Sequence, residues 1–364
     1  MTFIRPFDEA IKEMRHLDLE NLQGRRIPLI PLHDFEGWHV WLSTPEGQIM
    51  HLRPIEAAEA MYFAEKAANE SEDFHWLFVD FLVQRFELGK VTNRLSAIID
   101  DVWCLSASMA KIELIHQHVH DDRVALDWLV ATEIEYLVSV CRSMFDLLQE
   151  VIVHVWESIT LDGNDRRNAK LKQKFSDIVL RDDAVLSSDE ISHRSKIPDF
   201  LADYYAACGP FFLDLRNYRN KFLHRGDRAE RIYVSQWGFS VRKDAQPFAK
   251  WNVWDEESME TNVASLRPVL RYIVGNTLSA FARFAELMVQ RVRFPPPLAP
   301  GYTVFFRNAY NAALLRALSP DAKWWDRREQ TQPVPPVVLA AETPPSTPSG
   351  RASPADAPPD APIK

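Results

Sequence analysis

An arginine, an asparagine and a histidine follow one another at close spacing between residues 215 and 226. Arg219 and Asn220 are adjacent, and His224 comes four residues after Asn220. Arginine stays protonated at neutral pH and offers a planar set of donors to a phosphate, whereas histidine titrates near neutrality and can accept or donate a proton. These residue types at this spacing could therefore hold a phosphodiester and move the proton that its cleavage requires.

A helix would gather these side chains along one face. At about 100° per residue, Arg216, Asn220 and His224 line up on a polar side. Arg219 lies between this side and an apolar stripe on the opposite side. The predicted stripe consists of Phe211, Leu215, Tyr218 and Phe222. The helix is expected to bury the stripe and to present its polar face to a ligand, and Gly226 is placed to end it.

The chain is acidic overall but basic around this helix. The formal net charge of the 364 residues is −9, which argues against a general polyanion binder because nonspecific affinity for nucleic acids comes from Lys and Arg. Between residues 216 and 231, six cations face two acids, a local balance of +4. Such a patch suits a phosphate-bearing ligand. The alternative is a solvated helix end whose cations favour the helix dipole, which would explain Arg225 and Arg228 but not the spacing of Asn220 and His224.

The same residues resemble a known signature. Arg219-Asn220, followed by three residues and His224 and closed by Arg225-Gly226, is similar to the Arg-x4-6-His motif of the HEPN superfamily, in which a polar residue often follows the arginine. The resemblance covers residues 93–291 and does not reach the first ninety residues or the C-terminal tail. It implies a helical bundle and, as in catalytic members of the family, metal-independent cleavage of RNA through its own 2′-hydroxyl.

The resemblance also implies a role for each residue. His224 would be the general base or acid, Arg219 the phosphate clamp, and Asn220 the group that orients the histidine or contacts the phosphate. No metal or cofactor is required. One motif histidine per chain is too few for both an acid and a base, so the homodimer of the family, with two motif helices facing each other, is expected. Three further cations would contact RNA phosphates, namely Arg216, Lys221 and Arg225.

Two other functions fit the same residues. A HEPN-like bundle can serve as a non-catalytic dimerisation or protein-binding module, in which the motif caps a helix and the acidic body engages a partner. A bundle that binds a small nucleotide or phosphate at the arginine patch without cleaving it is the second alternative. The sequence carries no second catalytic signature, which favours a self-contained endoribonuclease. A role as a toxin or phage-defence effector, with an antitoxin as protein partner, would follow from the family alone.

Other patterns favour structural roles. His116 and His120 lie one helical turn apart, but no third metal ligand follows at a clear spacing. Arg142 and Asp146 are four residues apart on a predicted helix, which is typical of an ordinary salt bridge; the alternative is that one of them orients the motif arginine or asparagine. Glycine-rich phosphate loops followed by lysine, serine-nucleophile elbows and paired-cysteine metal motifs are absent from the sequence.

The cysteines and the lengths of the apolar segments indicate the cellular compartment. Cys104, Cys141 and Cys208 are odd in number and far apart, which indicates free thiols in a reducing environment. The first residues carry acids where a signal peptide needs an apolar core, and no segment is apolar for long enough to cross a bilayer. A soluble cytoplasmic protein is therefore expected.

The hydrophobic pattern predicts a mainly α protein, an antiparallel HEPN-like helical bundle. Its four long helices are expected at residues 91–118, 124–159, 198–224 and 257–291. We predict a small mixed α/β unit at 1–90, with helices at about 7–22, 55–69 and 73–88 and a hairpin within 25–54. The bundle is expected at 91–294, with a β-hairpin insertion at 231–242. Residues 295–330 would form a C-terminal helix, from about residue 304 to 318, and an extension. The proline-rich tail at 331–364 is expected to be disordered.

Overall fold

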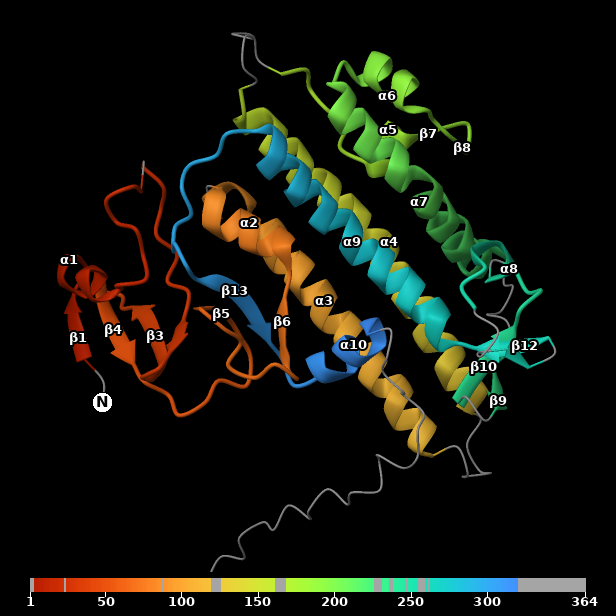
Figure 1. The fold of residues 1–364 in the computed structure, drawn as a ribbon, viewed down its shortest axis with the longest axis horizontal. Helices are drawn as coiled ribbons and strands as arrows, with labels where there is room; N and C mark the ends of the chain where they lie inside the picture. Colours follow the sequence, from red (N-terminus) through yellow and green to blue (C-terminus); the bar gives the residue numbers. More distant parts are fainter. Residues whose placement is uncertain are drawn as a thin grey trace, which may run out of the picture. The chain divides into compact units, whose positions relative to one another are not determined.

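Four long helices lie side by side in the computed structural model (Figure 1). They are α3 (Leu88–Gln117), α4 (Leu126–Ser158), α7 (Asp199–Arg225) and α9 (Arg267–Arg291). α4 packs against the other three, because its buried side chains recur at steps of three and four residues along one face. Three of the predicted helices agree with the structure within a few residues, and the fourth, predicted from residue 257, begins at Arg267.

The structure describes most of the chain up to residue 319. The described ranges are 3–22, 24–86, 88–118, 126–160, 168–225, 231–235, 238–246, 248–254, 259–260 and 262–319. They belong to one compact unit, Met1–Trp325. The predicted disordered tail at 331–364 lies outside the described residues, as does the end of the segment predicted at 295–330.

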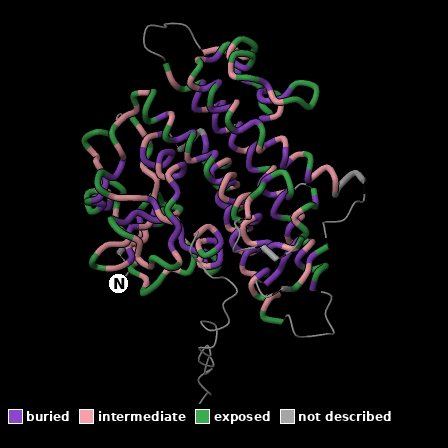
Figure 2. The backbone as a smooth tube through the Cα atoms, turned by 45° about the vertical axis from the view of Figure 1, so that its right-hand side comes forward, coloured by how far each residue is buried: buried purple, intermediate pink, exposed green. Residues whose placement is uncertain are grey.

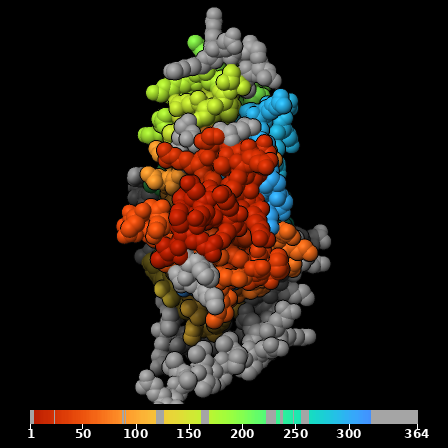
Figure 3. Space-filling view, turned by 90° about the vertical axis from the view of Figure 1, so that its left-hand side faces the viewer, coloured from red at the N-terminus to blue at the C-terminus, as the bar shows by residue number. Residues whose placement is uncertain are grey.

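A seven-stranded mixed sheet lies beside the helices. Its strand order is β1-β4-β3-β2-β5-β13-β6, and all neighbours are antiparallel except β2 and β5. In Figure 3 the N-terminal residues, red to orange, cover one side of the molecule, with a blue C-terminal segment along one edge. The strands are β1 (Phe3–Pro6), β2 (Leu32–Asp34), β3 (Gly37–Ser43), β4 (Gln48–Leu52), β5 (Ala60–Ala64), β6 (Asp73–His75) and β13 (Thr303–Arg307).

The sheet makes the fold α/β, so the prediction of a mainly α helical bundle was wrong. The decisive strand is β13, which was predicted as the start of a helix. Its apolar residues instead pair with strands on both sides, Val304 with Phe63 of β5 and Phe306 with Phe74 of β6. Residues 55–69 were likewise predicted to be helical but contain β5. Pairing between distant segments overrode the local pattern in both places.

Shorter elements surround the long helices. The predicted hairpin after α7 is confirmed, and β9 and β10 gain two more strands to form a second sheet, in the order β11-β12-β10-β9. The helix predicted at the start of the chain ends early, at residue 13, as α1 with a 3-10 turn. The short elements are α1 (Phe7–Ala10), α2 (Leu77–Arg85), α5 (Phe175–Val179), β7 (Leu180–Arg181), β8 (Ala184–Val185), α6 (Ser188–Ser195), β9 (Tyr233–Ser235), β10 (Gly238–Arg242), α8 (Phe248–Trp251), β11 (Met259–Glu260), β12 (Val263–Ser265) and α10 (Asn311–Leu318).

One hydrophobic core joins the large sheet to the helices. Figure 2 shows buried residues continuing from the N-terminal region into the long helices. α2 connects the two layers, because Trp76 just before it donates a hydrogen bond to the Leu278 carbonyl of α9 at 3.1 Å and Phe78 packs edge-on against Phe281 at 4.9 Å. The domain boundary predicted at residue 90 falls in the first turn of α3, and β13 returns to the sheet built by the first ninety residues.

A buried histidine is part of this core at the N-terminal sheet. His16 is only 4% exposed and stacks on Trp41 at 5.6 Å between ring centroids. Burial, then repulsion by His39, lowers the pKa of His16 from 6.5 to about 4, against a smaller opposing effect of Asp34. The imidazole therefore stays neutral in the folded protein at pH values where it is protonated in the unfolded chain.

Acidification is expected to destabilise the protein through His16. Above pH 6.5 both states are neutral and the residue makes no pH-dependent contribution; as the pH falls from 6.5 toward 4, the unfolded state alone gains a proton. About 3 kcal/mol of the free energy of unfolding should be lost by pH 4. Urea unfolding at pH 7, 5.5 and 4 should show a smaller decline for His16→Phe than for wild type, with His193→Gln, at an exposed histidine, as control. Equal declines in all three proteins would contradict the role of His16.

Candidate functional site

α7 buries one face and exposes the other, as its sequence pattern predicts. Leu215 and Tyr218 are buried, and Phe211 packs against the core. Phe212, which was not assigned to the stripe, is fully buried, so the buried face is wider than predicted. The side chain of Phe222 lies outside the described residues. Burial of this face holds the polar face of α7 outward.

The motif residues lie in the last two turns of α7. Arg219 and Asn220 are both partly exposed, as is Lys221. In the part of the chain that the structure describes, the side chains of these three residues make no hydrogen bond or ion pair. His224 and Arg225 belong to the same helix, but their side chains lie outside the described residues. The helix thus brings the predicted residues onto one element, and no described residue bonds to the side chain of Arg219 or Asn220.

Arg216 is bound by a carboxylate from a neighbouring hairpin. Its Nη1 lies 2.8 Å from Oδ1 of Asp183, and the two side chains are 33% and 73% exposed. Asp183 and Asp182 form the turn between β7 and β8, with φ values of 62° and 51°. A two-residue hairpin turn requires this left-handed backbone, which aspartate tolerates. The predicted phosphate contact is therefore already occupied by an oxyanion of the protein itself.

A polar pocket of about 400 Å³ surrounds this ion pair. Its cations come from separate segments of the chain and outnumber its acids by one. The Arg194 guanidinium is fixed there by donating to the Leu180 carbonyl at 3.3 Å. The pocket is thus a place where a phosphate could exchange with the Asp183 carboxylate. Its charged side chains are Lys172, Arg181, Arg194 and Arg216, with Asp177, Asp182 and Asp183.

A second set of contacts fixes α7 on its opposite flank. Asp214 is buried; it accepts a hydrogen bond from Nε1 of Trp251 at 3.1 Å and pairs with Lys250. Tyr218 packs edge-on against Phe248 and Trp251, with centroid distances of 5.6 and 6.0 Å. Because Tyr218 immediately precedes Arg219, these contacts fix the backbone of α7 where the motif begins.

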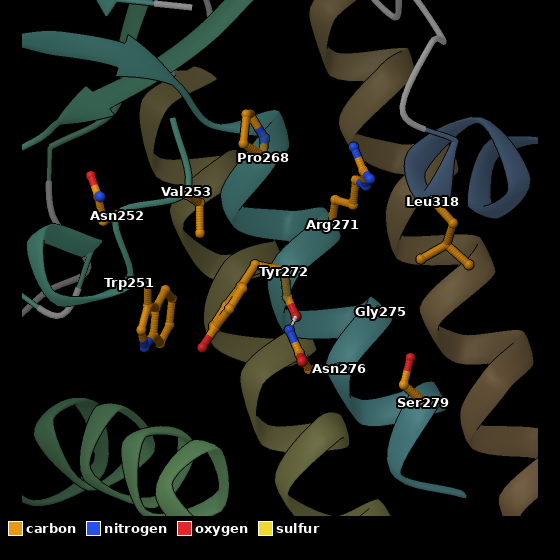
Figure 4. A pocket seen from close by; sticks show the side chains of 10 residues that line it. All are labelled: Trp251, Asn252, Val253, Pro268, Arg271, Tyr272, Gly275, Asn276, Ser279 and Leu318. Carbon is orange, nitrogen blue, oxygen red and sulfur yellow. Dashed lines mark hydrogen bonds between the residues drawn. The ribbon is translucent and has the colours of Figure 1, made fainter. Parts of the chain in front are cut away.

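An open groove of about 520 Å³ lies beside Trp251. Figure 4 shows Arg271 and Ser279 along one side of α9, with Tyr272 and Asn276 on the side nearer Trp251. The rings of Trp251 and Tyr272 are 5.2 Å apart, and Asn276 donates to the Tyr272 carbonyl at 2.8 Å. Trp251 therefore lines the groove and also packs against Tyr218 of α7. Arg219 and Asn220 do not line the groove.

The other candidate residues have structural surroundings. Arg142 pairs with Asp146 at 2.8 Å, and its guanidinium lies 4.4 Å from the centre of the Phe212 ring. The pair therefore contacts α7 at Phe212 rather than at Arg219 or Asn220. His120 lies outside the described residues, and His116 packs edge-on against Phe239 at 5.6 Å. Within the described ranges, no group of three or more metal-ligating side chains could hold a metal ion.

The three cysteines are free thiols, as predicted. Burial raises the pKa of the Cys141 thiol to about 12 and that of Cys208 to about 11. Thiols protonated to this extent are poor nucleophiles at neutral pH, which argues against a role for either residue in covalent catalysis.

The comparisons with known proteins add no further assignment. The sequence matches no protein-family model, and neither a curated protein nor a solved structure was found to be similar to it. Among the helices that the structure describes, none is long and apolar enough to cross a bilayer.

Sequence reasoning missed the groups that surround α7. Asp183 was not singled out from the sequence, although two aspartates between Leu180-Arg181 and Ala184-Val185 are a recognisable turn signal. Asp214 gave no signal, because a lone carboxylate on a predicted helix does not reveal that Lys250 and Trp251 will face it.

Proposed function

We propose that the protein is a metal-independent endoribonuclease of the HEPN type, with Arg219, Asn220 and His224 as its catalytic residues. The observation that carries the proposal is the adjacent, partly exposed pair Arg219 and Asn220, which makes no side-chain hydrogen bond or ion pair within the described residues. A polar pair left unpaired beside a rigidly packed helix face is suited to bind a ligand. The proposal rests on the residues of α7 and not on the fold class.

The chemistry follows from the residue types. His224 takes the proton of the RNA 2′-hydroxyl, whose oxygen then bonds to the adjacent phosphorus while the bond from phosphorus to the 5′-oxygen breaks. Arg219 neutralises the charge that builds on the phosphate oxygens, and Asn220 orients the histidine or the phosphate. A second His224, from the partner in a homodimer, protonates the leaving 5′-oxygen. The products are a 2′,3′-cyclic phosphate and a 5′-hydroxyl.

Arg216 supports the proposal as a phosphate contact. Its guanidinium already binds the Asp183 carboxylate at 2.8 Å, and a phosphate offers the same planar arginine a comparable pair of oxygens. Lys172, Arg181 and Arg194 line the same pocket and would extend the contact along an RNA backbone. Lys221 and Arg225 are proposed as further phosphate contacts on α7.

The test is cleavage of total RNA and tRNA by the purified protein in the presence of EDTA. Cleavage that leaves 2′,3′-cyclic phosphate ends, by a protein that light scattering finds to be dimeric, is the expected result. Cleavage that requires an added divalent cation would contradict a metal-independent enzyme. A stable protein that binds RNA or a nucleotide without cleaving it would instead favour the non-catalytic binding module.

The Asp183 carboxylate is expected to compete with RNA for Arg216. Asp183→Asn should strengthen the binding of an uncleavable 2′-O-methyl RNA by about two- to fivefold, because the exposed ion pair contributes up to about 1 kcal/mol. Filter binding at 0.15 M salt measures the change. Asp189→Asn is the matched control, since it removes the same charge from an exposed aspartate that does not line the pocket around Arg216. Equal gains in both variants would indicate a general charge effect instead of competition at Arg216.

A further inference from the structure

A second cationic pocket lies at the far end of the long helices. It is formed where α2, α4 and α9 end, and its volume is about 400 Å³. The groove beside Trp251 lies along the first half of α9, whereas this pocket follows the last residue of α9 (Figure 1). It shares no residue with the pocket around Arg216. The two cationic pockets are therefore separate sites.

Three arginines line this pocket. Arg25, Arg85 and Arg293 come from three different segments, and among the described residues of the lining there is no Asp or Glu. Burial, then repulsion by Arg85, lowers the pKa of Arg25, and Asp18 is the acid that opposes this effect. Asp18 is itself engaged, because it accepts hydrogen bonds from the backbone and the side-chain amide of Asn21 at 3.2 and 2.8 Å.

The bonds that two of the arginines make fix their positions but do not cancel their charge. Arg25 donates to the Gln84 carbonyl at 2.7 Å and to the Pro296 carbonyl at 2.9 Å. Arg85 donates to the Pro295 carbonyl at 3.1 Å. A backbone carbonyl carries only a partial negative charge, so these bonds leave the positive charge of the arginines uncompensated. Arg293 adds a third positive charge without adding a side-chain hydrogen bond to the described residues. In a pocket that served only the carbonyl bonds of Arg25 and Arg85, this charge would be unfavourable.

Arg293 is the side chain best placed to bind a ligand. It is exposed, and in the described part of the chain it makes no side-chain hydrogen bond or ion pair. Thr160 adds a hydroxyl to the lining, and Phe294 and Pro295 add an apolar wall. Three guanidinium groups around one concave space match a ligand that carries about three negative charges.

We propose that this pocket binds a small molecule bearing a diphosphate or triphosphate group. Such a ligand carries enough negative charge to pair with all three arginines. A carboxylate or a single phosphate would leave one or two of them unpaired. The volume falls in the range of small-molecule sites. The site lies apart from α7, so the ligand is expected to regulate or stabilise the protein and not to be the RNA that is cleaved.

Isothermal titration of the full chain with inorganic tripolyphosphate at 0.15 M salt tests the proposal. We expect one site per chain, and Arg293→Gln should weaken binding about tenfold, since it removes one charge-assisted contact. Arg291→Gln is the matched control, because Arg291 is also exposed and lies two residues away but does not line the pocket. Arg85→Gln is a second variant, and its folding is checked by circular dichroism.

The outcomes separate the sources of the ligand. Weaker binding of inorganic phosphate than of tripolyphosphate supports the charge match. Tighter binding of ATP than of tripolyphosphate would indicate that the apolar wall contacts the nucleoside. Two results would overturn the site. One is an equal loss of affinity in Arg291→Gln and Arg293→Gln. The other is no detectable binding of tripolyphosphate or ATP at about 1 mM, the dissociation constant of a weak ligand. The readout is binding alone, so a protein that fails to cleave RNA can still bind at this pocket.

Discussion

Cleavage of RNA is expected to fall by about 100- to 10,000-fold when His224 is replaced by alanine. A positioned acid or base contributes a factor of this size, and the proposed composite site would lose both of its histidines in one substitution. Arg219→Ala should cause a loss of similar size, since the phosphate would lose the charge that stabilises its transition state. Initial rates on one defined RNA, measured with EDTA present, give the ratio.

The matched controls change the same residue types outside the motif. His193→Ala and Arg15→Ala alter an exposed histidine and an exposed arginine of the described residues, and both should leave the rate within about twofold of wild type. Arg219→Lys keeps the charge but loses the planar fork of donors, so it should recover only part of the lost rate. Wild-type rates in His224→Ala, with the protein folded, would rule out the proposed mechanism.

Replacement of Arg307 by methionine is expected to lower the free energy of unfolding by about 3–5 kcal/mol. Arg307 holds the Asp73 carboxylate with two bonds, Nε to Oδ1 at 2.8 Å and Nη2 to Oδ2 at 3.0 Å. The Asp73 side chain has no exposed surface, and Tyr62 also donates to it, at 2.6 Å. Without the arginine, a carboxylate would be buried without its counter-ion. Urea unfolding at pH 7 measures the loss.

A surface pair supplies the control for this prediction. Arg316 forms the same two-bond contact with Glu113, but its side chain is 50% exposed, against 6% for Arg307. Arg316→Met should therefore cost less than about 1 kcal/mol. In the double variant with Arg307→Met and Asp73→Asn, part of the lost stability should return, because no buried charge remains. Equal costs at Arg307 and Arg316 would show that burial does not set the strength of the pair.

The long helices and the polar face of α7 could be predicted because their signals are local. The apolar residues of α4 recur every three or four positions, and the buried pair Leu215 and Tyr218 places Arg219 and Asn220 toward the surface within the same helix. Helix periodicity depends only on residues within a few turns of one another. The sequence alone therefore determined which residues share the polar face of α7, because no tertiary contact is needed to align them.

The tertiary structure alone decided the fold class and the surroundings of the site. Asp73 and Arg307 are 234 residues apart, and β13 pairs between β5 and the edge strand β6. No local pattern encodes this pairing, because it depends on which distant segment offers a free strand edge. The same holds for the carboxylate of Asp183 on Arg216 and for Arg25, Arg85 and Arg293 around one pocket. Contacts between distant charges arise only after the helices and sheet have packed, so their partners are set by the geometry of the core and not by spacing along the chain.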